Sequence, residues 1–203
     1  SMEMGADPVA ARLLSDAVFN SQTPIPYSKI IRHEVADWDI ERLEEANQHM
    51  ADLPIKIDYQ SALTVSDISV RARRRADELS SSGQRLDTIW IDHLGYMRSS
   101  DRYRGNKVYE TGEMTKSLRA LAKELGVSIQ LLCQLSRSVE NREDKRPQSS
   151  DARDSGNIEE DADCMLFPYR EAHYLANLSY GDDTEKEMKR RAKLEMMENI
   201  MEI

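Results

Sequence analysis

Two short apolar runs, separated by an amphipathic stretch, constrain the fold of this chain more than any other feature. The runs cover residues 88–91, which stop at Asp92, and residues 128–133, which stop at Gln134. The stretch between them has apolar residues at helical spacing and ends in a glycine typical of helix C-termini: Met114, Leu118, Leu121, Ala122, Leu125 and Gly126. This strand–helix–strand order predicts an α/β fold with a mostly parallel sheet flanked by helices.

The rest of the chain adds further helices and two weaker strand signals. Helices are predicted from Asp7-Pro8, from Asp37 and after the N-cap Thr64. Alternation over residues 55–59 and apolar character over 162–167 predict short strands. The sequence shows no internal repeat, so we expect a single domain.

Composition narrows the class of protein. The 203 residues carry 28 basic and 37 acidic side chains, a net charge of −9, which argues against binding nucleic acid by bulk charge alone. No apolar run is long enough to span a membrane, and the N-terminus does not resemble a signal peptide. Cys133 and Cys164 lack metal-ligand spacing and are predicted to be small buried residues in a reducing cytosol. The charged, Met-rich segment 180–203 fits one long helix, or a helix followed by a strand near 200–203.

Asp92 and Gln134 are the first candidate site residues, because each follows a predicted strand. Open α/β sheets bind ligands at the carboxyl ends of their strands. An Asp there holds Mg²⁺ in nucleotide hydrolases, and a Gln can contact a γ-phosphate. Taken alone, Asp92 fits an ordinary strand-ending residue that caps a turn better than a Mg²⁺ ligand, and Gln134 fits an ordinary loop residue equally well.

The polar segment 136–157 is a candidate phosphate-backbone contact. Its basic residues are interleaved with amide and hydroxyl side chains and include Arg137, Arg142, Lys145, Arg146 and Arg153. The segment also contains many acidic residues, so a solvated loop of balanced charge is the alternative. A second basic cluster, residues 71–75, lies on a predicted helix and is interpreted as a solvated or subunit-facing surface.

Five segments together resemble the DnaB family of replicative helicases. In family order they are Ser1-Met2-Glu3-Met4, Ile89-Trp90-Ile91-Asp92-His93-Leu94-Gly95-Tyr96-Met97, Ser117–Leu125, Gln134-Leu135-Ser136-Arg137-Ser138, and the run from Asp144 to Glu159. They correspond to the family's S-L-E-M, strand-Asp-Tyr-Leu-Gln-Leu-Met, following helix, Q-L-N-R-S, and D-K-R-P…S-D-L-R-E-S-G-S-I-E elements. The combination is far more specific than any one segment.

The resemblance implies a RecA-like ATPase core that forms a hexameric ring of identical subunits and translocates on single-stranded DNA. Glu3 would polarise the attacking water, Asp92 would coordinate Mg²⁺, and Gln134 would sense the γ-phosphate of ATP. Arg153, Asp154 and Gly156 would lie on the loop that follows the DNA backbone. The implied partners are primase and a helicase loader, and the implied setting is the cytoplasm of a bacterium, with the gene bacterial or phage-encoded.

The sequence departs from the family pattern in several places. The phosphate-cradling G-x-x-x-x-G-K-[ST] loop (Walker A) and the K-Q-R-N-G segment do not occur in the 203 residues. We therefore expect residues 1–203 to be a truncated motor domain, incomplete at both ends and inactive alone. His93, Gly95 and Asp154 replace the usual Tyr, Gln and Glu. Two other interpretations stay open: a recombinase-like ATPase, and a non-catalytic DNA-binding or ring-assembly remnant.

Overall fold

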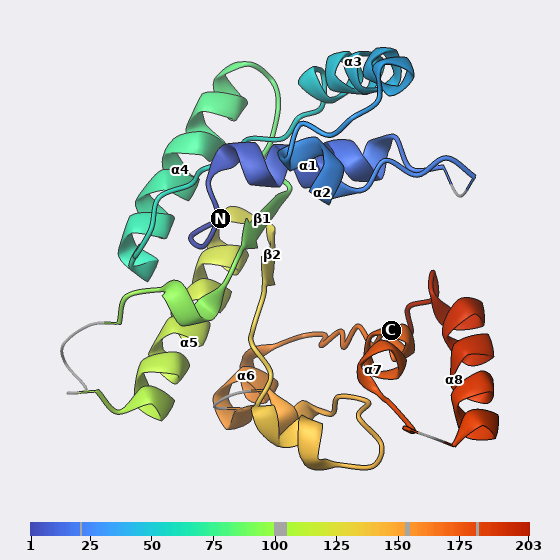
Figure 1. The fold of residues 1–203 in the computed structure, drawn as a ribbon. Helices are drawn as coiled ribbons and strands as arrows, with labels where there is room; N and C mark the ends of the chain where they lie inside the picture. The colour runs from blue at the N-terminus through green and yellow to red at the C-terminus, as the bar shows by residue number, and fades with distance from the viewer. Residues whose placement is uncertain (21, 100–104, 153–154, 182) are drawn as a thin grey trace. The chain divides into compact units, whose positions relative to one another are not determined.

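The computed structural model describes residues 1–20, 22–99, 105–152, 155–181 and 183–203, with the side chain of residue 155 left out. These residues form two compact units (Figure 1). The first unit comprises residues 1–100 and 120–133, and the second comprises residues 101–119 and 134–203. Helix α5 (Lys107–Leu125) contributes to both units.

A two-stranded parallel sheet lies in the first unit and confirms the predicted strand pairing. Strand β1 (Thr88–Ile91) pairs with β2 (Ser128–Leu131) in a register that places Ile91 beside Leu131. The pairing extends past β2, because the Leu132 N–H donates to the Ile91 carbonyl at 3.0 Å. β2 itself ends two residues before the predicted boundary at residue 133. Gly126, at a φ of 63°, ends α5 as expected and turns the chain into β2.

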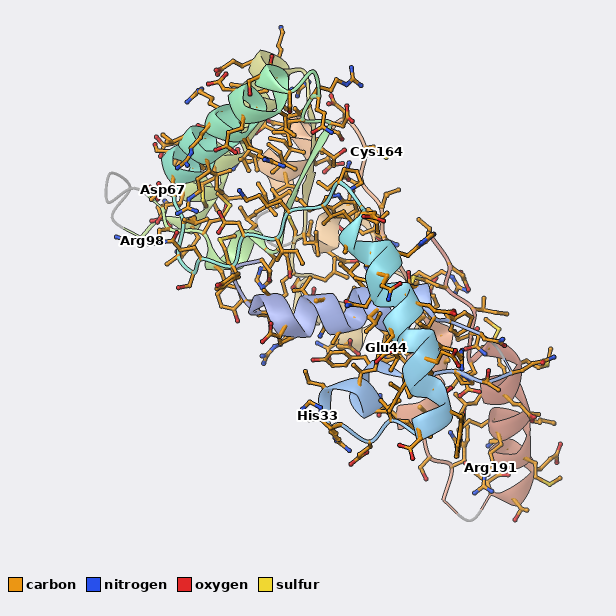
Figure 2. The ribbon with its side chains drawn as sticks, turned by 90° about the horizontal axis from the view of Figure 1, so that it is seen from above. His33, Glu44, Asp67, Arg98, Cys164 and Arg191 are labelled. Atoms are coloured by element: carbon orange, nitrogen blue, oxygen red, sulfur yellow. The ribbon has the colours of Figure 1, made fainter. Side chains whose placement is uncertain are left out.

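Helix α4 (Val65–Ser81) begins with the predicted cap. The Thr64 hydroxyl accepts from the Asp67 N–H at 3.1 Å, and the Asp67 carboxylate accepts from the Thr64 N–H at 2.9 Å. Hydrogen bonds from the Thr64 hydroxyl and N–H lower the pKa of the Asp67 carboxyl, which Figure 2 shows at the start of the helix. Buried Ile68 and Ala72 form the inner face of α4.

The basic cluster 71–75 on α4 is solvated and paired within the chain. Arg73 binds Glu124 of α5 through two hydrogen bonds of 2.7 and 2.8 Å, and Arg71 pairs with Asp58 at 2.5 Å. The remaining two arginines pair with Glu78, one turn further along the helix. The predicted solvated surface is therefore present, and its charges are largely neutralised.

Helices α1 (Ala6–Ala17), α2 (Tyr27–Ile31) and α3 (Asp37–Ala51) form the N-terminal part of the first unit, and α1 and α3 confirm the predicted helices. The cap of α1 differs from the prediction: Gly5 is the N-cap, and Asp7 lies in the first turn. Arg42 of α3 donates to the Val18 carbonyl at 3.0 Å, which ties α3 to the end of α1.

Residues 55–59 do not form the predicted strand. They pair with neither β1 nor β2, and Ile55 and Tyr59 are exposed. An alternating pattern predicts which side chains share a face, but it does not ensure that a partner strand lies alongside. In place of a strand pairing, the Asp58 carbonyl accepts a hydrogen bond from the Ser1 ammonium at 2.7 Å.

In the second unit the polar segment after Gln134 is folded around a buried carboxylate. Two 3₁₀ helices, η3 (Arg137–Asn141) and η4 (Ser149–Asp151), lie in it, and Leu135 pairs with Ala152 in an antiparallel bridge. Arg142 binds the buried Asp151 through hydrogen bonds of 2.6 and 3.2 Å.

Helix α6 (Ser155–Asp161) packs on the second unit's part of α5 through polar contacts. The Thr115 hydroxyl donates to Asp161 at 2.5 Å, and the Asn157 amide donates to the Val108 carbonyl at 2.9 Å. A Cβ at Gly112 would lie 2.8 Å from the Asn157 Cγ, so the glycine allows this close approach.

The C-terminal part contains α7 (Glu171–Asn177) and α8 (Thr184–Met197). Glu202 then forms an antiparallel bridge with Tyr169, which agrees with the second of the two predicted alternatives for residues 180–203. The predicted strand at 162–167 is wrong: these residues are unpaired and Leu166 is 67% exposed, so the run does not face the core.

The two cysteines differ in burial. Cys133 is partly buried, and this burial raises the pKa of its thiol. Cys164 is exposed (Figure 2), which corrects the expectation that both would be buried, because it follows α6 in the segment that lacks a strand partner. Within the described ranges, no helix is long and apolar enough to cross a membrane.

Candidate functional site

Residues 1–3 lie against the carboxyl end of β1. The Met2 N–H donates to the Asp92 carbonyl at 2.8 Å, and the Ser1 hydroxyl donates to Asp92 Oδ2 at 3.1 Å. Asp92 directly follows the last residue of β1 and is partly buried. The first residues of the sequence and the end of a parallel strand, about ninety residues later, thus form one site at the sheet edge.

Glu3 lies at this same edge. Its side chain is 49% exposed, and its Oε2 is 3.9 Å from Nε2 of His93, the residue after Asp92. The structure therefore places at one sheet edge both Glu3 and Asp92, the two acidic residues to which the resemblance assigns the water and Mg²⁺ roles.

His93 and Gly95 are site features that sequence reasoning did not identify as functional. The Gly95 N–H donates to His93 Nδ1 at 2.9 Å, within the short 3₁₀ helix η1 (Leu94–Tyr96) and its N-cap. The ring of Tyr96 lies 4.7 Å from the His93 ring, centroid to centroid. In the sequence, the one sign of these features was that His93 and Gly95 replace the Tyr and Gln of the family pattern. That difference does not predict how the two residues are arranged.

The donor set fits a hydrated Mg²⁺ better than a metal enclosed by protein. In the ranges that the structure describes, no group of three or more His, Cys, Asp or Glu side chains could hold a metal ion. Mg²⁺ is commonly bound by one or two carboxylates, with waters and substrate phosphates completing its shell. Asp92 matches that pattern, since its carboxylate accepts only from the Ser1 hydroxyl among the described residues and retains free lone pairs.

Gln134 and Arg137 belong to the second unit and are both exposed. Neither side chain makes a hydrogen bond or ion pair to any other residue in the described ranges. Both are thus available to a ligand.

The other basic residues of the polar segment are mostly engaged within the chain. Arg142 pairs with Asp151, and Arg146 pairs with Glu202 through two hydrogen bonds of 2.8 and 2.9 Å. Lys145 donates to the Glu140 carbonyl at 2.6 Å. These three side chains stabilise the fold of the segment. Fewer basic residues are therefore free to contact a phosphate backbone than the sequence suggested.

The remaining nucleic-acid candidates lie at the start of α6. Arg153 and Asp154 lie outside the described residues. Gly156 is exposed in the first turn of α6, and a Cβ placed there would meet nothing within 4 Å, so its backbone is open to a ligand.

Comparison with known proteins identifies the family. The model of the DnaB-like helicase C-terminal domain matches residues 1–200, and this chain belongs to that family. It is 40% identical over 175 residues to the replicative DNA helicase DnaB of Geobacillus stearothermophilus, covering 86% of this chain and 36% of that protein. It is 35% identical over 203 residues to the DnaB of Rickettsia typhi, covering all of this chain and 39% of that protein.

Two solved structures share the fold. A DnaB-like replicative helicase, described with its interactions with primase, superimposes with a TM-score of 0.75 at 30% identity, covering 90% of this chain and 42% of that one. A second structure, described as an ATPase domain, gives a TM-score of 0.74 at 28% identity, covering 90% of this chain and 62% of that one. The fold is therefore RecA-like, as expected, and the chain spans about a third to two fifths of the curated relatives it matches.

Proposed function

We propose that this chain is the ATPase-domain portion of a replicative DNA helicase, which hydrolyses ATP to move along single-stranded DNA and unwind the duplex. One observation carries the proposal: Glu3 and Asp92 both lie at the carboxyl end of β1, in a chain of which residues 1–200 match the helicase family. The recombinase and remnant alternatives are not favoured, because the relatives are replicative helicases.

The two acidic residues divide the chemistry between them. Phosphoryl transfer needs mainly positioning and charge neutralisation. Asp92 would hold Mg²⁺, which when bound neutralises charge on the phosphate oxygens of ATP. Glu3, half exposed, would accept a proton from the water that attacks the γ-phosphate. Gln134, which follows the strand paired with β1, would donate its amide to that phosphate.

DNA binding is assigned to the polar segment of the second unit. Arg137 is exposed and unpaired within the described ranges, and Gly156 presents open backbone. Arg153 and Asp154 share the loop in the family pattern. Together they would contact phosphates rather than bases.

The longer protein would form a hexameric ring of identical subunits, with primase and a loader as partners in the cytoplasm of a bacterium. Support comes from the curated relatives, of which this chain covers 40% or less, and from the DnaB-like helicase described with primase. The phosphate-cradling loop absent from these 203 residues would be supplied by that longer polypeptide, so this stretch alone is expected to be inactive.

The test is DNA-stimulated ATP hydrolysis and forked-duplex unwinding by the polypeptide encoded in the natural open reading frame. Asp92→Asn should abolish both activities, because it removes the charge that holds Mg²⁺. Glu44→Gln is the matched control, since Glu44 is an exposed acidic residue on α3 (Figure 2). Unwinding that survives in Asp92→Asn would overturn the proposal.

A further inference from the structure

We propose that His93 is a positioning residue for Glu3: its Nε2–H orients the Glu3 carboxylate toward the attacking water. The inference rests on the proposed function, because it gives Glu3 its catalytic role. His93 is a position at which this chain differs from the family pattern, which has Tyr there.

The hydrogen bond from Gly95 determines which ring nitrogen faces Glu3 as a donor. His93 Nδ1 accepts the Gly95 N–H at 2.9 Å. A neutral imidazole whose Nδ1 is an acceptor carries its proton on Nε2. Nε2 is also the ring atom that approaches Glu3, at 3.9 Å from Oε2. The ring therefore presents a donor, and not an acceptor, to the carboxylate.

Gly95 makes this ring position possible. A Cβ at residue 95 would lie 2.7 Å from His93 Cε1 and 3.0 Å from Nδ1, closer than the ring could tolerate. Any side chain at residue 95 would thus displace the imidazole. The His93 side chain is 21% exposed and has the Tyr96 ring on one side, so it has little freedom to reorient.

Glu3, in contrast, has few constraints of its own. Its side chain is 49% exposed, and no Lys or Arg side chain in the described ranges lies within ion-pair distance of it. A separation of 3.9 Å is longer than a direct hydrogen bond, and a small rotation of the Glu3 side chain or one bridging water closes it. Engaging Oε2 leaves the second carboxylate oxygen for the attacking water.

The first test is kinetic and uses the full polypeptide. His93→Phe keeps a ring but removes the donor, and should lower kcat for ATP about fivefold while leaving KM within about twofold. His93→Gln places an amide donor at a similar reach and should restore most of the loss. The inference is overturned if His93→Phe keeps its full kcat, or if His93→Gln is as slow as His93→Phe.

The second test does not depend on turnover. Nitrogen-15 NMR of the 203-residue chain should show the Nε2–H tautomer of His93. Gly95→Ala should shift those ring signals. An Nδ1–H tautomer would overturn the inference while leaving the proposed function intact. Full hydrolysis by a Glu3→Gln variant would instead overturn the proposed function, so the two failures are distinguishable.

Discussion

Asp151 is a buried carboxylate whose partners all come from the polar segment around it. It accepts two hydrogen bonds from Arg142 and one from the Gln148 N–H at 2.8 Å. From the sequence, this segment was either a phosphate-backbone contact or a solvated loop of balanced charge. In the structure, Arg142 instead neutralises the buried Asp151. Residue type alone could not distinguish an arginine that binds DNA from one that neutralises a buried acid.

Replacing Arg142 tests this assignment. Arg142→Ala leaves the buried Asp151 without its cation and should lower the free energy of unfolding by about 2 kcal/mol. Arg137→Ala is the control in the same segment, since that side chain is exposed, and it should change stability by less than about 0.5 kcal/mol. Thermal unfolding followed by circular dichroism measures both. Equal melting temperatures for the two variants would show that the Arg142–Asp151 pair does not stabilise the fold.

At the scale of elements, the predictions succeeded where a local pattern and tertiary burial agree. β1 and β2 pair with each other and the inner face of α5 contains Leu118 and Leu121, both buried. The predicted strands at 55–59 and 162–167 have the right local pattern but no partner. Periodicity carries no information about which segment lies alongside, so these two predictions failed.

The site divides in the same way. Asp92 could be predicted as a site residue from its position directly after a strand, whereas Glu3 was predicted only from the family resemblance. The side chain of His93 packs closely on Gly95, and that of Asn157 packs closely on Gly112. These contacts depend on turn geometry or on residues far apart in the chain, so they could not be predicted from local sequence patterns.

Helix α8 gives a prediction about pH. Its Glu187 binds Arg190 at 2.6 Å and Arg191 at 3.1 Å, and the hydrogen bonds from Arg190 above all lower the pKa of Glu187 to about 2 from its ordinary value of 4.5. Arg190 also donates to the Leu175 carbonyl of α7 at 2.7 Å. A depressed carboxyl pKa stabilises the folded state above the unfolded pKa, and this contribution disappears as the pH falls through the folded pKa.

We therefore expect the contribution of this cluster to be constant from neutral pH to near pH 4.5 and to be lost between about pH 4.5 and 2. Hydrogen exchange of the α7 and α8 amides across this range measures it. Glu187→Gln removes the titrating group and should flatten the dependence in this helix pair. An unchanged pH profile in the variant would assign the loss to other carboxylates.

At the scale of the whole molecule, each unit carries one part of the proposed activity. The first unit holds the acidic pair at the end of β1, and the second holds the exposed polar segment with Arg137 and Gly156. The chain spans about a third to two fifths of its curated relatives, so the proposed ring and its proposed motion along DNA would belong to the longer protein.

Single-turnover ATP hydrolysis by the Glu3→Gln variant of that protein tests the central claim most directly. The substitution preserves size and hydrogen bonding but removes the charge that, in the proposed mechanism, would accept a proton from water. Hydrolysis should slow by roughly 10²–10⁴-fold, in kcat, while nucleotide binding stays nearly unchanged. If Glu3 instead only favours the start of the nearby helix α1, the variant would lose about 0.3–1 kcal/mol of stability and keep its turnover. A near-normal kcat, with a slightly lower melting temperature, would contradict the account.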